Sequence, residues 1–203
     1  MAKIKYTKTE LKQQRDGLRR FERYLPTLQL KKQQLQMEVR QMEAEIEAKA
    51  REEQEARDDL RSWVDLFAEP IPFENYLKVV SIEQTVNNIA GVSIPVLEDI
   101  IFERQVPDLF TSRPWWDDGL DMLQQLARLR GERLLLEEGH RRLVQELRTT
   151  TQRVNLFEKV KIPETRENIR VIRIFLGDQQ TAEVARAKMA KDRAVKAEEA
   201  VAV

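Results

Sequence analysis

The sequence predicts a mainly α-helical protein, a long antiparallel two-helix coiled coil that carries a small middle module with a β-hairpin. Three observations predict this fold. Charged residues make up 34% of the 203 residues and glycines number only 6, a composition typical of long solvated helices. Apolar residues recur at heptad spacing on both sides of the centre of the chain. Five of the seven prolines fall between Pro70 and Pro114, and no long helix passes through so many prolines.

The prolines divide the chain into three predicted domains. Residues 1–67 are predicted to form an N-terminal coiled-coil helix, residues 68–116 a middle module with a β-hairpin, and residues 117–203 a C-terminal coiled-coil helix with a basic tail. Two long helices joined by a connector are expected to fold back on each other. If Phe67 lies near Leu120, residues at equal height along the pair have numbers that add up to roughly 187.

Heptad counting supports the first helix. With Leu11 at position a, most a and d positions are apolar in one register that continues across Pro26. The a positions are Leu11, Leu18, Leu25, Lys32, Val39, Ile46, Glu53, Leu60 and Phe67, and the d positions are Gln14, Phe21, Leu28, Leu35, Met42, Lys49, Ala56 and Trp63. A repeat sustained over so many heptads favours a coiled coil over a globular helix.

The second helix is predicted to begin near Asp117 and Asp118, which suit a first helical turn. A mostly apolar stripe follows, made of Met122, Leu126, Leu129, Arg133, Leu136, His140, Leu143, Leu147, Thr150, Val154 and Phe157. Beyond Phe157 the stripe slips by one position, to Ile162, Ile169, Ile172 and Leu176. The slip falls at Pro163, where an irregular turn is expected.

The antiparallel alignment makes two further predictions. Pro26 faces roughly residue 161, so Pro26 and Pro163 are interpreted as one shared bend of the shaft, the alternative being a kink that only fits curvature. Polar interruptions of the two stripes also face each other. We call Lys49, Glu53, Arg133, Glu137 and His140 the register belt, and we expect Glu53–Arg133 and Lys49–Glu137 pairs that fix alignment more than stability. The alternative is that these side chains point into solvent.

The middle module contains β-branched residues with partial alternation from Leu77 to Glu103. Asn88 to Gly91 supplies turn chemistry between the two runs. The pattern predicts a β-hairpin in which Pro95 lies at an edge or a bulge, packed on the helices or on a partner because isolated hairpins are marginal. The aromatic residues Trp63, Phe67, Trp115 and Trp116, with Pro114, are expected to pack at the end of the coil, the alternative being an aromatic binding anchor.

Charge is balanced overall but unevenly distributed. Residues 1–40 carry eleven Lys or Arg against four acids, whereas residues 65–121 carry eleven acids against three basic residues. Opposite fields in two parts of one chain suit two different partners. The basic segment permits nucleic-acid binding in principle, but stacking aromatic residues are sparse and no recognition motif is present, so no nucleic-acid partner is predicted.

Little in the sequence points to catalysis. The chain has no cysteine, which excludes disulfides and thiolate zinc sites, and His140 is its only histidine. It has no phosphate-binding glycine loop of the Walker type. We therefore predict a non-catalytic protein with no cofactor and no metal. No signal peptide is visible, and no apolar stretch reaches the roughly 20 residues that cross a bilayer, so direct membrane insertion is not expected.

The stretch "RVNLFEKVKIPETRENIRVIRIFL", from Arg153 to Leu176, resembles the C-terminal signature of the D subunits of V-type (A/V-type) ATPases and ATP synthases. In that family an Arg-Val-Asn segment precedes an Ile-Pro pair and an isoleucine-rich helix. The matching positions here are Arg153, Val154, Asn155, Phe157, Glu158, Ile162, Pro163, Ile169 and Ile172. The segments "YLPTLQLKK", from Tyr24 to Lys32, and "AKMAKDR", from Ala187 to Arg193, resemble the bacterial branch of the family.

The resemblance implies a central rotor-stalk subunit that transmits torque between the catalytic head and the membrane ion-translocating rotor, for ATP synthesis or ATP-driven proton or sodium transport. It implies contacts with the A and B subunits of the hexameric head, with the F subunit of the stalk and with the socket subunit (C/d type) of the membrane rotor. The signature residues would contact the head, and the protein would be cytoplasmic and peripheral to the membrane. The alternative is a coiled-coil adaptor or RNA-binding arm unrelated to rotation, and a membrane-surface helix fits less well because the apolar stripe is narrow.

Overall fold

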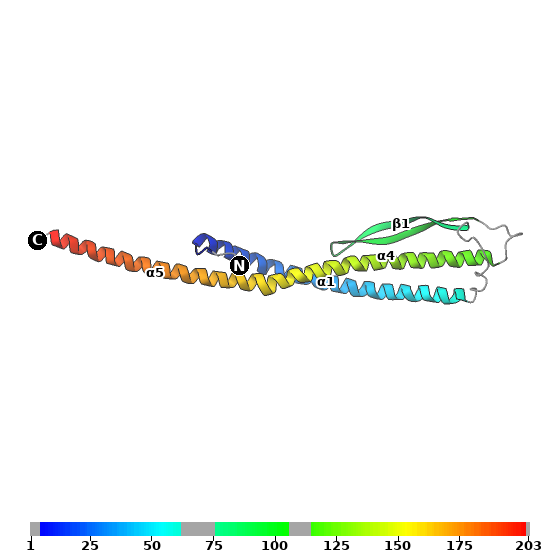
Figure 1. The fold of residues 1–203 in the computed structure, drawn as a ribbon, viewed down its shortest axis with the longest axis horizontal. Helices are drawn as coiled ribbons and strands as arrows, with labels where there is room; N and C mark the ends of the chain where they lie inside the picture. Colours follow the sequence, from blue (N-terminus) through cyan, green and yellow to red (C-terminus); the bar gives the residue numbers. More distant parts are fainter. Residues whose placement is uncertain (1–4, 62–75, 106–114, 202–203) are drawn as a thin grey trace. The chain divides into compact units, whose positions relative to one another are not determined.

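The computed structural model describes residues 5–61, 76–105 and 115–201. The elements follow one another as α1 (Lys8–Arg61), β1 (Leu77–Ile89), β2 (Val92–Arg104), α4 (Trp116–Asn155), η1 (Leu156–Lys161) and α5 (Ile162–Val201) (Figure 1). The fold is therefore mainly α-helical with one hairpin in its middle, as predicted. Of the aromatic residues expected at the end of the coil, Trp63 and Phe67 lie outside the described residues, as does Pro114. Trp116 stacks edge-on against Tyr76, with ring centroids 5.3 Å apart.

The chain divides into two compact units. One comprises Met1–Leu30 with Thr151–Val203, and the other comprises Lys31–Thr150. The hairpin thus shares a unit with the parts of α1 and α4 on which it packs. We refer to these as the terminal unit and the hairpin unit, and we describe each by itself.

Helix α1 follows the predicted heptad register. Every a and d position from Leu11 to Leu60 is buried or half-buried, and none is exposed. The helix continues through Pro26, whose ring removes one backbone donor, and the hydroxyl of the next residue, Thr27, donates to the Tyr24 carbonyl at 2.8 Å. Because the pattern of burial repeats every seven residues, one side of α1 faces a partner helix along the described length.

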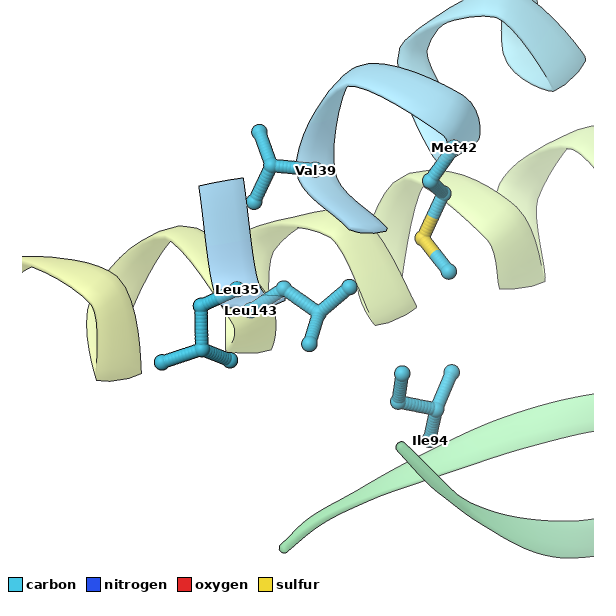
Figure 2. Packing of buried hydrophobic residues seen from close by; sticks show 5 residues of the cluster. All are labelled: Leu35, Val39, Met42, Ile94 and Leu143. Atoms are coloured by element: carbon cyan, nitrogen blue, oxygen red, sulfur yellow. The ribbon is translucent and has the colours of Figure 1, made fainter. Parts of the chain in front are cut away.

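The hairpin unit is an antiparallel helix pair with the hairpin laid on it. Lys31 pairs with Glu146 at 2.8 Å and Lys49 pairs with Glu132 at 3.0 Å. Residue numbers therefore increase along α1 while they decrease along the facing part of α4, so the two helices are antiparallel. The core of the unit joins three elements, because α1 and α4 contribute side chains that meet one from the hairpin (Figure 2). Its members are Leu35, Val39, Met42, Leu143 and Ile94.

Strands β1 and β2 form the predicted antiparallel hairpin, each of 13 residues. Ala90 and Gly91 form the two-residue turn with φ of 51° and 82°, a pair of positive values that matches the twist of the strands. The Asn88 side chain accepts a hydrogen bond from the Gly91 amide at 2.9 Å. Pro95 stands opposite Val86 in the register, and since the sheet has only two strands, Pro95 lies on an edge strand as expected.

Two glycines of α4 let β2 approach the helix closely. A Cβ atom on Gly139 would lie 2.5 Å from Cγ2 of Ile94, and one on Gly131 would lie 2.7 Å from Cδ1 of Ile100. Both isoleucines are almost fully buried. Glycine inside a helix costs about 1 kcal/mol relative to alanine, so close packing of the hairpin provides the physical reason for glycine at these two positions.

The terminal unit is also an antiparallel pair. The rings of Tyr6 and Phe175 lie 5.0 Å apart, and those of Phe21 and Phe157 lie 5.2 Å apart, so residue numbers fall on one helix as they rise on the other. The α5 residues from Gly177 to Ala194 are exposed throughout. Across the described ranges, no helix is both long enough and apolar enough to span a bilayer.

Candidate functional site

The irregular turn predicted at Pro163 is a six-residue π-helix, η1, which immediately precedes Ile162 and Pro163. The Ile162 amide donates to the Phe157 carbonyl, five residues back. Pro163 has no amide hydrogen, and in an α-helix its ring would clash with the carbonyl four residues earlier. The wider π turn inserts one extra residue into the helix. That residue accounts for the one-position slip of the apolar stripe after Phe157.

The signature residues divide into two groups by burial. The buried group, at most 8% exposed, holds the terminal unit together and is closed to a partner in this conformation; its members are Val154, Ile162, Ile169 and Ile172. Four others, Arg153, Asn155, Glu158 and Pro163, are exposed, and Phe157 is half-buried. Only the exposed group is open to contact with another protein, and the sequence alone did not separate the two groups.

The turn around η1 is fixed by contacts with α1. Phe157 packs on Phe21, and Arg166 donates to Glu22 at 2.7 Å. The Thr165 hydroxyl, which is buried, donates to the Lys161 carbonyl at 2.6 Å. Pro163, between Phe157 and Arg166, therefore lies across from Phe21 and Glu22, about one helical turn before Pro26 along α1.

An open groove of the terminal unit is lined largely by arginines of α1 and α5. The lining arginines are Arg15, Arg19, Arg166, Arg170 and Arg173. Arg166 pairs with Glu22 and Arg170 with Glu167, whereas Arg15, Arg19 and Arg173 form no ion pair with another described residue. The groove therefore carries surplus positive charge that can bind carboxylates or other anions. The uneven charge of residues 1–40 signalled this surface, but not its arginines from α5.

In the hairpin unit, Glu53 is the centre of an ion-pair cluster. Its side chain is 4% exposed and accepts hydrogen bonds from Arg133 at 2.6 Å and Arg130 at 3.2 Å, with Arg57 at 2.5 Å. Burial alone raises the pKa of Glu53 and is the largest single effect, but the hydrogen bonds from Arg133 and Arg130 and the charge of Arg57 together lower this pKa below its ordinary value. Glu53 is therefore a paired carboxylate that joins α1 to α4.

The structure brings together only part of the register belt. Glu53 meets Arg133, as expected, and Arg133 also donates to Glu137 at 2.7 Å. The expected Lys49–Glu137 pair is wrong, because Lys49 pairs with Glu132 and with Glu52 of its own helix, contacts that raise the pKa of Lys49.

His140 lies apart from the Glu53 cluster and contacts Glu43, with Nε2 3.2 Å from Oε1.

The Lys49 pair was wrong because the predicted alignment of α4 against α1, anchored at Phe67 and Leu120, is shifted by about one helical turn. Lys49 therefore faces Glu132 instead of Glu137. Arg130 and Arg57 are the functional residues that the heptad stripes missed, since neither lies on a stripe. Within the described ranges, no group of acidic, histidine or cysteine side chains is arranged to hold a metal ion.

Comparison with known proteins gives one consistent result. The family model for the D subunit of ATP synthases matches residues 10–192. The D subunit of the V-type ATP synthase of Borreliella burgdorferi is 45% identical over 196 residues, which is 97% of each chain. The proteins of the same name from Chlamydia felis and Chlamydia trachomatis serovar L2 are 34% and 36% identical over 95% of this chain and 94% and 96% of theirs. This chain belongs to the family of ATP synthase D subunits.

Proposed function

We propose that this protein is the central rotor-stalk subunit of a V-type ATPase or ATP synthase. It transmits torque between the catalytic head and the membrane ion-translocating rotor, for ATP synthesis or for ATP-driven transport of protons or sodium ions. In this proposal ATP is made or hydrolysed by other subunits. It is supported by a relative that is 45% identical over 97% of this chain and is named as the D subunit of a V-type ATP synthase.

The observation that carries the proposal is that each of the two units contains an antiparallel helix pair held by contacts between its helices. Helix α1 has 54 residues, which corresponds to roughly 80 Å at about 1.5 Å per residue. Partial or full burial at every described a and d position resists separation of the helices. The Phe21–Phe157 contact and the Glu53 cluster, in the two units respectively, tie the helices against sliding.

The two helix irregularities supply asymmetry. Pro26 lies within α1 and η1 precedes Pro163 on the opposing helix. A rod that is not rotationally symmetric favours different conformations of a surrounding ring at different angles, because each angle presents a different surface. Two surfaces of the terminal unit would contact the A and B subunits of the head. One is the arginine groove, and the other is the group of exposed signature residues Arg153, Asn155 and Glu158.

The acidic and hairpin-bearing unit is proposed to contact the F subunit of the stalk and the socket subunit of the membrane rotor. The protein would then be cytoplasmic and held at the membrane through the complex. A pull-down of the tagged chain with mass spectrometry tests this directly. Recovery of the head, stalk and socket subunits supports the proposal. Strongly salt-dependent RNA binding without those subunits would instead support the adaptor or RNA-binding arm.

The torque role has its own test. The double variant Pro26→Ala and Pro163→Ala, reconstituted into the complex, is expected to lower the number of ions transported per ATP hydrolysed. Gln33→Ala serves as the matched control, because it also introduces alanine into α1 but lies at an exposed position of the hairpin unit. Unchanged coupling in the proline variant would count against the shared bend. Failure of the unmodified chain to assemble with the head would count against the function itself.

A further inference from the structure

Strand β1 exposes an unusual amount of apolar surface. Val79, Val80, Ile82 and Val86 are all more than half exposed. Strand β2 differs, because Ile94 and Ile100 are buried against the glycines of α4. The hairpin lies along α4 (Figure 1) and packs on this helix mainly through β2, whereas these four side chains of β1 stay exposed. A row of exposed β-branched residues on one strand marks a surface that is covered in the working protein.

The backbone of β1 is equally open. The sheet has two strands, so β1 pairs with β2 on one edge only, and no backbone hydrogen bond within the described ranges joins its other edge to a neighbour. Proteins usually protect such an edge with lysines, prolines or a short strand. This strand has 13 residues, no proline, and only Lys78 and Glu83 as charged residues, so its own sequence does little to block pairing with another strand.

The charge around this edge is acidic. Glu83 stands opposite Asp99 in the register, an arrangement of like charges that is unfavourable in a sheet. Asp99 has Arg128 at 3.5 Å, whereas Glu83 has no ion-pair partner among the residues described. Arg104, the only arginine of the hairpin, is already bound by Asp117 and Asp121. An incoming strand with a basic residue near Glu83 would relieve the repulsion.

We propose that β1 is a docking edge to which another subunit of the complex adds a strand. The added segment is extended, carries β-branched or other apolar residues against Val80, Ile82 and Val86, and places a lysine or arginine near Glu83. Main-chain hydrogen bonds then supply affinity and the side chains supply specificity. A second copy of this chain fits less well, because two acidic hairpins repel each other. The inference goes beyond the proposed function and rests on it only for the identity of the partner as a subunit of the same complex.

Hydrogen–deuterium exchange tests the proposal on the full-length chain. Amide exchange in residues 77–89 is measured for the isolated chain and for the chain in the reconstituted complex. We expect exchange in β1 to slow roughly tenfold or more in the complex, since newly bonded amides exchange only after local opening. Unchanged exchange of β1 in an assembled complex overturns this inference but leaves the proposed function intact, whereas failure to assemble rejects the proposed function.

Variants separate strand addition from other contacts. The double variant Val80→Lys and Val86→Lys places edge lysines at two exposed positions and is expected to remove the protection and to lower recovery of the partner. Glu83→Lys is expected to weaken binding as well. Met37→Lys, a change of the same kind at a position of α1 that is 71% exposed, is the control and retains binding. Two results would overturn the assignment. One is an equal loss of partner binding in the Met37→Lys control. The other is a concentration-dependent homodimer of the isolated chain that the two edge lysines abolish.

Discussion

Gly139 lies directly beneath Ile94, so that a Cβ atom on this glycine would come within 2.5 Å of the isoleucine Cγ2. The contact leaves no room for any side chain on α4 at this point. Ile94 in turn belongs to the core that joins both helices to the hairpin. The close fit of one glycine and one branched side chain therefore fixes where the hairpin sits.

We expect Gly139→Ala to lower the free energy of unfolding by up to about 2 kcal/mol, because an overpacking cost of about 1–3 kcal/mol is only partly offset by the gain of about 1 kcal/mol in helix propensity. The Cγ2 of Ile94 is attached at the branch and cannot rotate away alone. Gly131→Ala should be nearly neutral, since its Cβ would clash only with the terminal Cδ1 of Ile100 and would meet Cγ1 at an ordinary contact distance. Gly177→Ala, with open space around it, should stabilise by about 1 kcal/mol. Chemical denaturation of the three variants gives the order, and a stabilised Gly139→Ala would contradict the packing described.

Removal of the Glu53 carboxylate should destabilise the hairpin unit. We expect Glu53→Gln to cost about 2 kcal/mol, because hydrogen bonds to charged groups contribute about 1.5–3 kcal/mol each and the arginines remain partly hydrated. Glu52→Gln is the neighbouring control, since its side chain is half-exposed and exposed pairs contribute about 1 kcal/mol or less. Equal losses in the two variants would show that burial of Glu53 is unimportant.

The pH dependence of stability follows from the same carboxylate. The pKa of Glu53 is lowered in the folded protein from 4.5, so the unfolded state binds the proton more readily. Its stabilising contribution is complete above about pH 4.5 and is lost as the pH falls through the lower folded-state pKa. We expect the difference in stability between the native protein and Glu53→Gln to shrink as acid is added. A difference that stays constant from about pH 7 to about pH 3 would contradict this prediction.

The aromatic contact of the terminal unit should be measurable as a coupling. Phe21→Ala and Phe157→Ala, alone and together, form a double-mutant cycle in which we expect a coupling of about 0.5–1.5 kcal/mol. Leu156→Ala is the control, because this neighbour within η1 is 44% exposed and should couple to Phe21 by less than about 0.5 kcal/mol. Additive losses in the Phe pair would mean that the two rings do not touch in solution.

Replacement of Pro26 should strengthen α1. Pro26→Ala restores an amide donor and removes the clash with the preceding turn, so we expect stability to rise by up to about 3 kcal/mol. Thermal unfolding measures this, with Leu30→Ala as an exposed control on the same helix. A loss of stability would show that the coil is built around the proline ring.

The elements of the fold could be predicted because each has a local cause. The heptad positions of α1 are the ones that the structure covers, and the turn lies at Ala90 and Gly91, within the predicted Asn88 to Gly91 segment, where the Asn88 side chain accepts a hydrogen bond from the Gly91 amide. The one-residue slip after Phe157 predicted an irregular turn, and the structure shows η1 there. Each of these signals lies within a few residues of the feature that it predicts.

Features that depend on exact height or on a third element were harder to predict. The partner of Lys49 was wrong because a two-helix alignment anchored at one point drifts by a turn, and a turn is enough to replace Glu137 by Glu132. Gly131 and Gly139 gave a signal, since glycine is unfavourable in a helix, but nothing in the sequence connects them to Ile94 and Ile100. Heptad counting also treats Glu53 only as a polar residue that interrupts the apolar stripe of α1, although the structure places its carboxylate among three arginines.

The extra residue carried by η1 has a consequence for how this chain tolerates change in length. One residue rotates everything after it by about 100° around the helix axis. Without this offset, Ile169 and Ile172 would turn toward water and polar neighbours would take their places. A single-residue deletion between Val154 and Ile162 would therefore rotate the side chains of α5 away from their present direction. An insertion within the same short interval would restore that direction. The π turn thus sets the rotational position that buries Ile169 and Ile172 in the terminal unit.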